Sequence, residues 1–128
     1  MKHVLFVCVE NSCRSQIAEA FARMIGGADI AALSAGSRPS GVVNAKAIAS
    51  MRERGYDLSQ HTSKSVADLP DVAYDHVITM GCGDECPNLP ARHRDDWPIP
   101  DPKEMPMEAF REVRDDIERR VRELLGAS

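Results

Sequence analysis

The chain has few aromatic residues and no long apolar segment. Aromatic side chains make up 5% of its 128 residues, and no apolar run approaches the roughly 20 residues that a membrane-spanning helix needs. The apolar stretch at residues 3–8 is too short for a signal peptide and lacks a small-residue cleavage site. We therefore expect a cytoplasmic protein that has no membrane partner.

An excess of positive charge is also absent. Lys and Arg number 16 against 20 Asp and Glu, which gives a net charge of -4. Proteins that bind nucleic acid cluster positive charge against the phosphate backbone, so the composition argues against a nucleic-acid partner. Hydrophobic residues make up 43% and charged residues 28%, which is typical of a globular chain. The length fits a single domain over residues 1–128.

Cysteines are few and form two local pairs, Cys8 with Cys13 and Cys82 with Cys86. In a reducing compartment such pairs favour chemistry or metal binding over structural disulfides. Their spacings are not those usual in zinc sites, and the histidines show no metal-ligand spacing, so we expect no metal. Two alternatives stay open for Cys82 and Cys86: inert small residues, or zinc ligands together with the first pair.

Strand and helix patterns alternate along the chain. Short apolar runs predict four strands, the last of them weak: 3–7, 29–33, 76–79 and 97–99. Apolar residues three and four apart predict three helices: 15–25, 45–54 with Asn44 as N-cap, and 107–124. This alternation predicts a small three-layer α/β domain with a parallel sheet. Loops that follow the strands then gather at one sheet edge, where such folds bind ligands.

The loop after the first strand carries the clearest chemical pattern. From Cys8 to Ser15 it reads Cys-Val-Glu-Asn-Ser-Cys-Arg-Ser and leads into the first helix. Such a loop turns backbone N–H groups toward one point and forms an anion nest, to which Arg14 adds a planar cationic fork. The same positive field stabilises a thiolate at Cys8, and the Ser15 hydroxyl is placed to donate a hydrogen bond to it. Asn11 suits a left-handed backbone position.

The predicted oxyanion-binding residues are Val9, Glu10, Asn11, Ser12, Cys13 and Arg14. A buried cysteine at a strand end, followed by an ordinary capping serine, is the structural alternative for this loop. Cys13 is interpreted as a structural member of the loop, and a protective disulfide with Cys8 under oxidation is the alternative.

The pattern Val7-Cys8-x-x-Asn-Ser-Cys-Arg-Ser-Gln-x-Ala-Glu19 resembles the phosphate-binding loop of the low-molecular-weight protein tyrosine phosphatase superfamily. Over nearly its whole length the chain is more similar to the arsenate reductase branch. Further matches are Ser34-Ala35-Gly36, 44–48, 61–63, 82–90, Asp96-Trp97 and Asp101-Pro102. The resemblance implies a flavodoxin-like, four-stranded parallel sheet. It also implies Cys8 as the nucleophile, Arg14 as the oxyanion ligand and Asp101 as the general acid. Ser15 is counted among the catalytic residues because its hydroxyl is placed to hydrogen-bond the thiolate.

The second cysteine pair favours a reductase over a phosphatase. Reduction of As(V) to As(III) takes two electrons, most simply from two thiolates. The resemblance implies that Cys8 attacks arsenate, Cys82 attacks Cys8, and Cys86 then attacks Cys82. No bound cofactor is implied, and the disulfide passes to an external thiol: thioredoxin or a glutaredoxin-type protein, or glutathione or mycothiol. Because the Cys82–Cys86 separation is shorter than the family's usual spacing, attack by the external thiol in place of Cys82 stays open.

Two other functions stay open. A low-molecular-weight protein tyrosine phosphatase would form a phosphocysteine at Cys8, and a non-enzymatic module would bind oxyanions or metals. The family's phosphatases usually have an aromatic residue after the Asp-Pro of the acid loop, whereas this chain has Lys103. The scarcity of aromatic side chains likewise favours a bare inorganic anion such as arsenate or phosphate over an aryl ester.

Residues around the loop are expected to support its shape. Some members of the superfamily bind potassium beside the loop, and Asn11, Glu19 and Ser34 match three of those ligands. Lys64 stands where the resemblance implies an aspartate. We therefore expect the Lys64 ammonium to take the place of the metal ion and to hold Glu19.

Overall fold

Four parallel strands form the centre of the protein, which was analysed as a computed structural model that describes residues 2–81 and 89–126. The strands are β1 (Lys2–Cys8), β2 (Ile30–Gly36), β3 (Tyr74–Thr79) and β4 (Ala91–Asp96). They are ordered β2-β1-β3-β4, and every neighbouring pair is parallel. This is the order of the first strands in a flavodoxin-like sheet. The predicted α/β fold with a four-stranded parallel sheet is confirmed.

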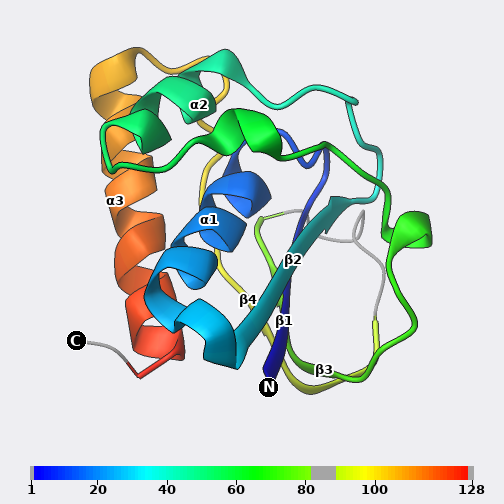
Figure 1. Ribbon diagram of the computed structural model, residues 1–128. Coiled ribbons are helices and arrows are strands. Elements are labelled where there is room, and N and C mark those ends of the chain that lie inside the picture. Colours follow the sequence, from blue (N-terminus) through cyan, green and yellow to red (C-terminus); the bar gives the residue numbers. More distant parts are fainter. Residues whose placement is uncertain (1, 82–88, 127–128) are drawn as a thin grey trace.

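Three helices cover one face of the sheet (Figure 1): α1 (Arg14–Gly26), α2 (Ala45–Arg52) and α3 (Met107–Leu124). Side chains of β1 alternate between the two faces, as a pleated strand requires. Phe6 and Cys8 pack in the core under the helices. Leu5 and Val7 pack on the opposite face, against the segment that contains the short 3-10 helix η3 (Val66–Asp68). Helices, sheet and the η3 segment form the three layers.

The helix predictions are confirmed because their local signals are strong. α1 ends at Gly26 and is followed by Gly27, whose φ of 57° suits glycine. At the start of α2 the Asn44 side chain accepts hydrogen bonds from the N–H groups of Lys46 and Ala47, at 2.8 and 3.2 Å. The apolar face of α3 is buried in the core. Of the helices in the described residues, none is long and apolar enough to cross a membrane.

Two strand predictions need correction. The predicted strand at 29–33 extends to Gly36, because pairing with β1 continues until Gly36 lies opposite Cys8. The prediction of a fourth strand at 97–99 is wrong: β4 comprises the preceding six residues, 91–96, most of which are charged and exposed. As an edge strand, β4 pairs only with β3, so an apolar pattern is not required of it. The buried Trp97 and Ile99 enter the core just after the strand.

The winding of the sheet determines where a ligand can bind. The chain reverses its winding direction between β1 and β3, and open α/β sheets bind ligands in the crevice at that point. Cys8 ends β1, and Met80 follows β3 directly, where its N–H donates to the Val7 carbonyl at 2.9 Å. The predicted oxyanion loop therefore begins at the place that the topology favours for binding.

Candidate active site

A small cavity at the carboxyl end of β1 brings together residues from two distant segments. Its lining comprises Cys8, Glu10, Ser12, Cys13, Arg14, Asp101 and Lys103. The cavity volume is ≈ 10 Å³, room for about one water molecule. The structure thus places Cys8, Arg14 and Asp101 around one point, although more than 80 residues of the sequence separate Arg14 from Asp101.

The Cys8 sulfur lies against a hydroxyl at the start of α1. Sγ is 2.8 Å from Ser15 Oγ, and Cys8 is only 2% exposed. The Asn11 amide Nδ2 donates to the same Oγ at 2.7 Å. Since an amide nitrogen can only donate, the Ser15 oxygen accepts from Asn11, and its own proton is available to the sulfur. Ser15 is therefore the donor in its contact with the Cys8 sulfur.

Arg14 is buried and is tied to the scaffold by one of its amino groups. Nη1 donates to the Met80 carbonyl at 2.6 Å and to the Ile99 carbonyl at 3.1 Å, whereas Nη2 lies 4.0 Å from Asp101 Oδ2. Gly81 makes room for this contact, because a Cβ there would lie 3.0 Å from Nη1 and 2.9 Å from the Ile99 oxygen. The guanidinium is thereby fixed beside the cavity with Nη2 nearest the predicted acid.

Cys13 lines the same cavity but is chemically distinct from Cys8. Burial, helped by the negative charge of Asp101, raises the pKa of Cys13 to about 12. The Cys13 side chain therefore stays a neutral thiol at physiological pH, and a neutral thiol is a poor nucleophile. This agrees with the interpretation of Cys13 as a structural member of the loop.

The backbone of the loop offers hydrogen-bond donors. The described residues supply no acceptor for the N–H groups of residues 10–15. The first N–H groups of a helix lack intrahelical partners and carry the positive end of its dipole. Asn11 has a φ of 50°, the left-handed conformation predicted for it. Donors without protein acceptors, beside Arg14 and at a helix start, suit a tetrahedral anion.

Buried amides hold this loop in shape. Asn11 is fully buried, and its Oδ1 accepts from the Lys64 N–H and from Gln16 Nε2, each at 2.9 Å. Gln16 Nε2 also donates to the Asn11 carbonyl at 3.1 Å and to the Thr62 carbonyl at 3.0 Å. These contacts explain the predicted supporting role of Asn11. No role was predicted for Gln16 from the sequence. Its position inside the loop motif was the signal that could have revealed one.

A histidine and a tyrosine extend the network outward. His61 Nδ1 lies 2.9 Å from Gln16 Oε1, and its Nε2 lies 2.6 Å from the Tyr56 hydroxyl. Burial lowers the pKa of His61, so the ring is neutral at physiological pH. Because Gln16 Oε1 can only accept, Nδ1 carries the proton and Nε2 accepts from Tyr56. Hydrogen bonds thus run in one direction from Tyr56 to the Cys8 sulfur.

Glu19 is held by more cations than the sequence suggested. Ser34 Oγ donates to Glu19 Oε1 at 2.5 Å, and the Lys64 ammonium lies 3.7 Å from the same oxygen. Arg23 is closer, with Nη2 at 2.8 Å from Oε2. The predicted Lys64 contact is present, but the stronger partner, Arg23, was missed. Its position four residues after Glu19 on α1 was the signal that could have revealed it.

Two of the six predicted oxyanion-binding residues, Val9 and Asn11, are absent from the lining of the cavity. The Val9 carbonyl accepts from the Arg38 N–H at 2.8 Å. Cys82 and Cys86 lie outside the described residues. Within the described ranges, no group of three or more His, Cys, Asp or Glu side chains is placed to hold a metal ion.

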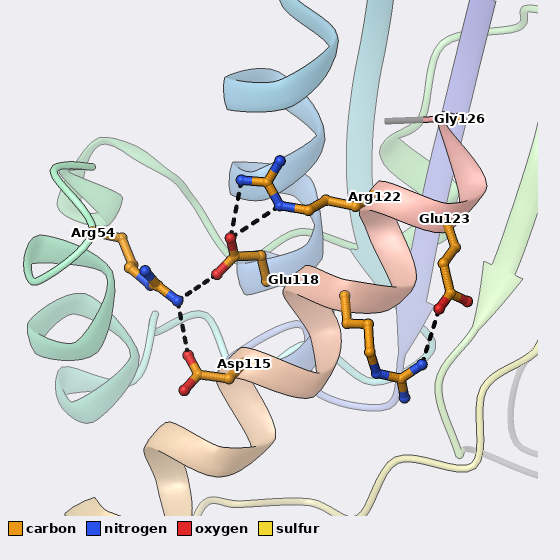
Figure 2. A pocket seen from close by; sticks show the side chains of 7 residues that line it. Arg54, Asp115, Glu118, Arg122, Glu123 and Gly126 are labelled. Atoms are coloured by element: carbon orange, nitrogen blue, oxygen red, sulfur yellow. Dashed lines mark hydrogen bonds and ion pairs between the residues drawn. The ribbon is translucent and has the colours of Figure 1, made fainter. Parts of the chain in front are cut away.

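A larger groove lies on the outer face of α3, away from this cavity (Figure 2). Its volume is ≈ 730 Å³, but it has no cysteine in its lining. Its charges pair with one another: Arg54 Nη2 lies 2.6 Å from Glu118 Oε1 and 3.3 Å from Asp115 Oδ1, and Arg122 Nη2 lies 3.1 Å from Glu118 Oε2. These pairs connect the end of α2 to α3 and offer no nucleophile.

The family of the chain follows from comparison with known sequences. The profile of the family described as low molecular weight phosphotyrosine protein phosphatase matches residues 3–128. The chain belongs to this family. A relative from Synechocystis sp., named a glutaredoxin arsenate reductase, is 41% identical over 129 residues, which cover 98% of each chain.

Solved structures of the family agree with the fold. A structure described as an arsenate reductase in the phosphate binding state has a TM-score of 0.88 and 42% identity, with 98% of each chain covered. A thioredoxin-dependent arsenate reductase of Corynebacterium glutamicum has a TM-score of 0.81 and 37% identity, over 98% of this chain and 61% of its own.

Proposed function

We propose that this family member reduces arsenate to arsenite, with Cys8 as the nucleophile. The observation that carries the proposal is the Cys8 sulfur, which lies 2.8 Å from the Ser15 hydroxyl in a cavity shared with Arg14 and Asp101. Relatives and structural neighbours at about 40% identity that are named arsenate reductases support arsenate as the substrate.

The first step forms a bond between sulfur and arsenic. Arsenate binds to the loop N–H groups and to Arg14, and the Cys8 thiolate attacks the As(V) centre. Asp101 gives a proton to a hydroxyl group of the arsenate, which departs as water. The Lys103 N–H donates to Asp101 Oδ1 at 3.1 Å, which leaves Oδ2 toward Arg14 and the cavity. The product of this step is a Cys8–As(V) thioester-like adduct without any change in oxidation state.

The second step transfers two electrons. The Cys82 thiolate attacks Cys8 Sγ, the sulfur–arsenic bond breaks, and arsenic keeps the bonding pair and leaves as arsenite, As(III). The two sulfurs are now joined in a Cys8–Cys82 disulfide. Cys86 then attacks Cys82, which releases the Cys8 thiolate and leaves a Cys82–Cys86 disulfide. An external dithiol, or two monothiols, reduces that disulfide and restores the chain.

The external reductant is proposed by class. The thioredoxin-dependent neighbour supports a dithiol protein, and the glutaredoxin arsenate reductase supports a glutaredoxin-type protein with glutathione. Mycothiol would serve in the same chemical role. Each of these thiols requires a reducing compartment, so a cytoplasmic location is part of the proposal.

The lining of the cavity supports a bare inorganic anion over an aryl ester. Among the described residues, no aromatic side chain lines the cavity and could pack against an aryl ring. The family is named for phosphotyrosine protein phosphatase activity. In this chain such hydrolysis would pass through a phosphocysteine at Cys8 and would require only that one cysteine, so it must survive the loss of Cys82 and Cys86.

Arsenate-dependent NADPH consumption tests the proposal. The reduced chain is supplied with arsenate and either thioredoxin with its reductase, or glutathione with glutaredoxin and glutathione reductase. The parent chain is expected to turn over with at least one system, and Cys8→Ser is expected to be inactive with both. Cys86→Ser is expected to complete one turnover but not many. Aryl phosphate hydrolysis that survives in Cys82→Ser and Cys86→Ser, without arsenite production in the parent, would contradict the proposal.

A further inference from the structure

A salt bridge joins two of the residues that line the cavity with Cys8. Lys103 Nζ lies 3.1 Å from Glu10 Oε1 and 3.4 Å from Glu10 Oε2. Glu10 belongs to the oxyanion loop, and Lys103 follows Asp101 in the segment before α3, so the bridge joins the two walls of the cavity. The Glu10 carboxylate raises the pKa of Lys103, which keeps the ammonium charged.

The cavity is too small to hold a tetrahedral oxyanion. A volume of ≈ 10 Å³ holds about one water molecule, whereas a tetrahedral oxyanion has five heavy atoms. The entrance must therefore widen before an oxyanion can reach the loop N–H groups. Glu10 adds a second obstacle, because its carboxylate repels an anion that approaches the cavity.

We propose that the Glu10–Lys103 salt bridge is a latch that a tetrahedral oxyanion opens, and that Lys103 is a specificity-determining residue for bare oxyanions. The incoming anion competes with Glu10 for the Lys103 ammonium. Once released, Lys103 contacts the bound anion from above while the loop N–H groups and Arg14 contact it from below. The proposal rests on the proposed function only in taking arsenate as the natural guest.

The exposure of the pair suits a latch. The Lys103 and Glu10 side chains are 44% and 38% exposed, and solvent-exposed ion pairs contribute little to stability, so opening the bridge costs little. A dianion close to Lys103 offers a larger negative charge than the single carboxylate of Glu10. The Lys103 ammonium therefore moves from Glu10 to the bound anion only when such an anion is present.

The latch also explains why an ester would be excluded. The organic group of a phosphoester needs space beyond that of its tetrahedral group, and in this proposal it competes for that space with the Glu10 and Lys103 side chains, which line the cavity. A bare oxyanion has no such group and lets Lys103 close over it. The backbone N–H of Lys103 holds Asp101 at 3.1 Å, so closure by Lys103 also keeps the proposed acid in place.

The test is calorimetric titration of the reduced full chain with inorganic phosphate and, separately, with phenyl phosphate. Four chains are compared: the parent, Glu10→Gln, Lys103→Met, and the variant that carries both substitutions. Glu10→Gln is expected to bind phosphate three- to tenfold more tightly, because Lys103 is then free. The gain from Glu10→Gln is expected to be smaller when Lys103→Met is also present. The preference for phosphate over phenyl phosphate is expected to fall at least fivefold in the double variant.

Matched controls come from an exposed pair on α3 that lies outside the cavity. Arg119 and Glu123 are 58% and 67% exposed, with Nη1 and Oε1 3.1 Å apart. Arg119→Gln and Glu123→Gln remove the same charges from the chain, and each is expected to change phosphate affinity less than twofold. Larger effects in these controls would show that net charge, not the latch, governs affinity, and would overturn the proposal.

Other outcomes overturn it as directly. Affinity unchanged or weakened in Glu10→Gln, an equal gain with and without Lys103, or an unaltered preference in the double variant each contradicts the latch. Arsenite production, measured in the same chains, separates the two proposals. If the phosphate affinities shift as expected but no arsenite forms, the proposed function fails and the latch stands. If arsenite forms in a Cys8-dependent reaction without those shifts, only the latch fails.

Discussion

Ser15 Oγ lies 2.8 Å from Cys8 Sγ and accepts a second hydrogen bond, from Asn11 Nδ2 at 2.7 Å. The hydrogen bond from Asn11 fixes the direction of the Ser15–Cys8 hydrogen bond. Because Ser15 Oγ accepts from Asn11, Ser15 donates its own proton to the sulfur. A hydroxyl that donates to sulfur stabilises the thiolate, and the thiolate is the form that attacks arsenic. The geometry at the start of α1 thereby links the shape of the loop to the reactivity of its cysteine.

Ser15→Ala is expected to slow alkylation of Cys8 at neutral pH. Ser15 Oγ lies 2.8 Å from the sulfur, and hydrogen bonds to charged groups contribute about 1.5–3 kcal/mol, so the loss of the hydroxyl is expected to slow labelling by roughly tenfold or more. The measurement is the rate of iodoacetamide labelling of Cys8, followed by peptide mass spectrometry. Ser50→Ala is the matched control, because Ser50 is equally buried but donates to the Ala47 carbonyl on α2. Equal rates in Ser15→Ala and Ser50→Ala would refute the role of the hydroxyl.

Gly36→Ala is expected to distort the oxyanion loop. A Cβ at Gly36 would lie 2.6 Å from the Val9 carbonyl oxygen and 3.0 Å from the Asn11 nitrogen, and both are backbone atoms that cannot swing aside. We expect the free energy of unfolding to fall by about 1–3 kcal/mol, as overpacking does elsewhere, and phosphate affinity to fall with it.

Urea unfolding and phosphate titration measure the two effects. Gly41→Ala is the control, because Gly41 has a φ of 82° but a Cβ there meets nothing within 4 Å. It is expected to lower stability through backbone strain alone and to leave phosphate affinity unchanged. Parent-like phosphate affinity in Gly36→Ala would show that the loop does not depend on this close packing.

Stability is expected to fall as the pH drops below about 6.5. Burial lowers the pKa of His61 from its usual 6.5, so in this range the unfolded chain binds a proton that the folded chain does not. The free energy of unfolding therefore rises with pH up to about 6.5 and then levels off, with a slope of at most about 1.4 kcal/mol per pH unit for one histidine. Carboxylates titrate lower, near pH 4, and leave this window clear.

His61→Gln is expected to reduce that slope. Burial also lowers the pKa of His76, so part of the slope is expected to remain until His76→Gln is added. Urea unfolding at a series of pH values between 5 and 8 measures the slopes, a range that spans the ordinary titration of histidine. A slope in His61→Gln as large as that of the parent would mean that His61 is not held neutral in the folded chain.

The sequence predicted those features that depend on local signals. Asn44 caps its helix, Asn11 adopts a left-handed conformation, and the loop from Cys8 lies between a buried strand and a helix start, each as predicted. Such features arise from residues within a few positions of one another, so periodicity and residue type reveal them. Asp101 could be placed beside Cys8 and Arg14 only through the family resemblance.

The missed features depend on backbone atoms or on exposed charges. Arg14 is anchored by the backbone carbonyls of Met80 and Ile99, which are 66 and 85 residues away. Because every residue type has a backbone carbonyl, the sequence cannot indicate which carbonyls accept these hydrogen bonds. Strand β4 was misplaced because its edge position requires no apolar residues. In the sequence, Lys103 was significant only because it stands where the family's phosphatases have an aromatic residue. Its contact with Glu10, which is 93 residues away, could be recognised only from the fold.

The most direct test of the account is a single turnover without any external reductant. The fully reduced parent chain is mixed with excess arsenate, and arsenite and free thiols are counted after the reaction stops. The account predicts one arsenite per chain and the loss of two free thiols per chain, with neither change in Cys8→Ser. Arsenite production by Cys8→Ser, or a parent chain that binds arsenate and forms no arsenite, would contradict the claim that Cys8 and the chain's own thiols carry the reduction.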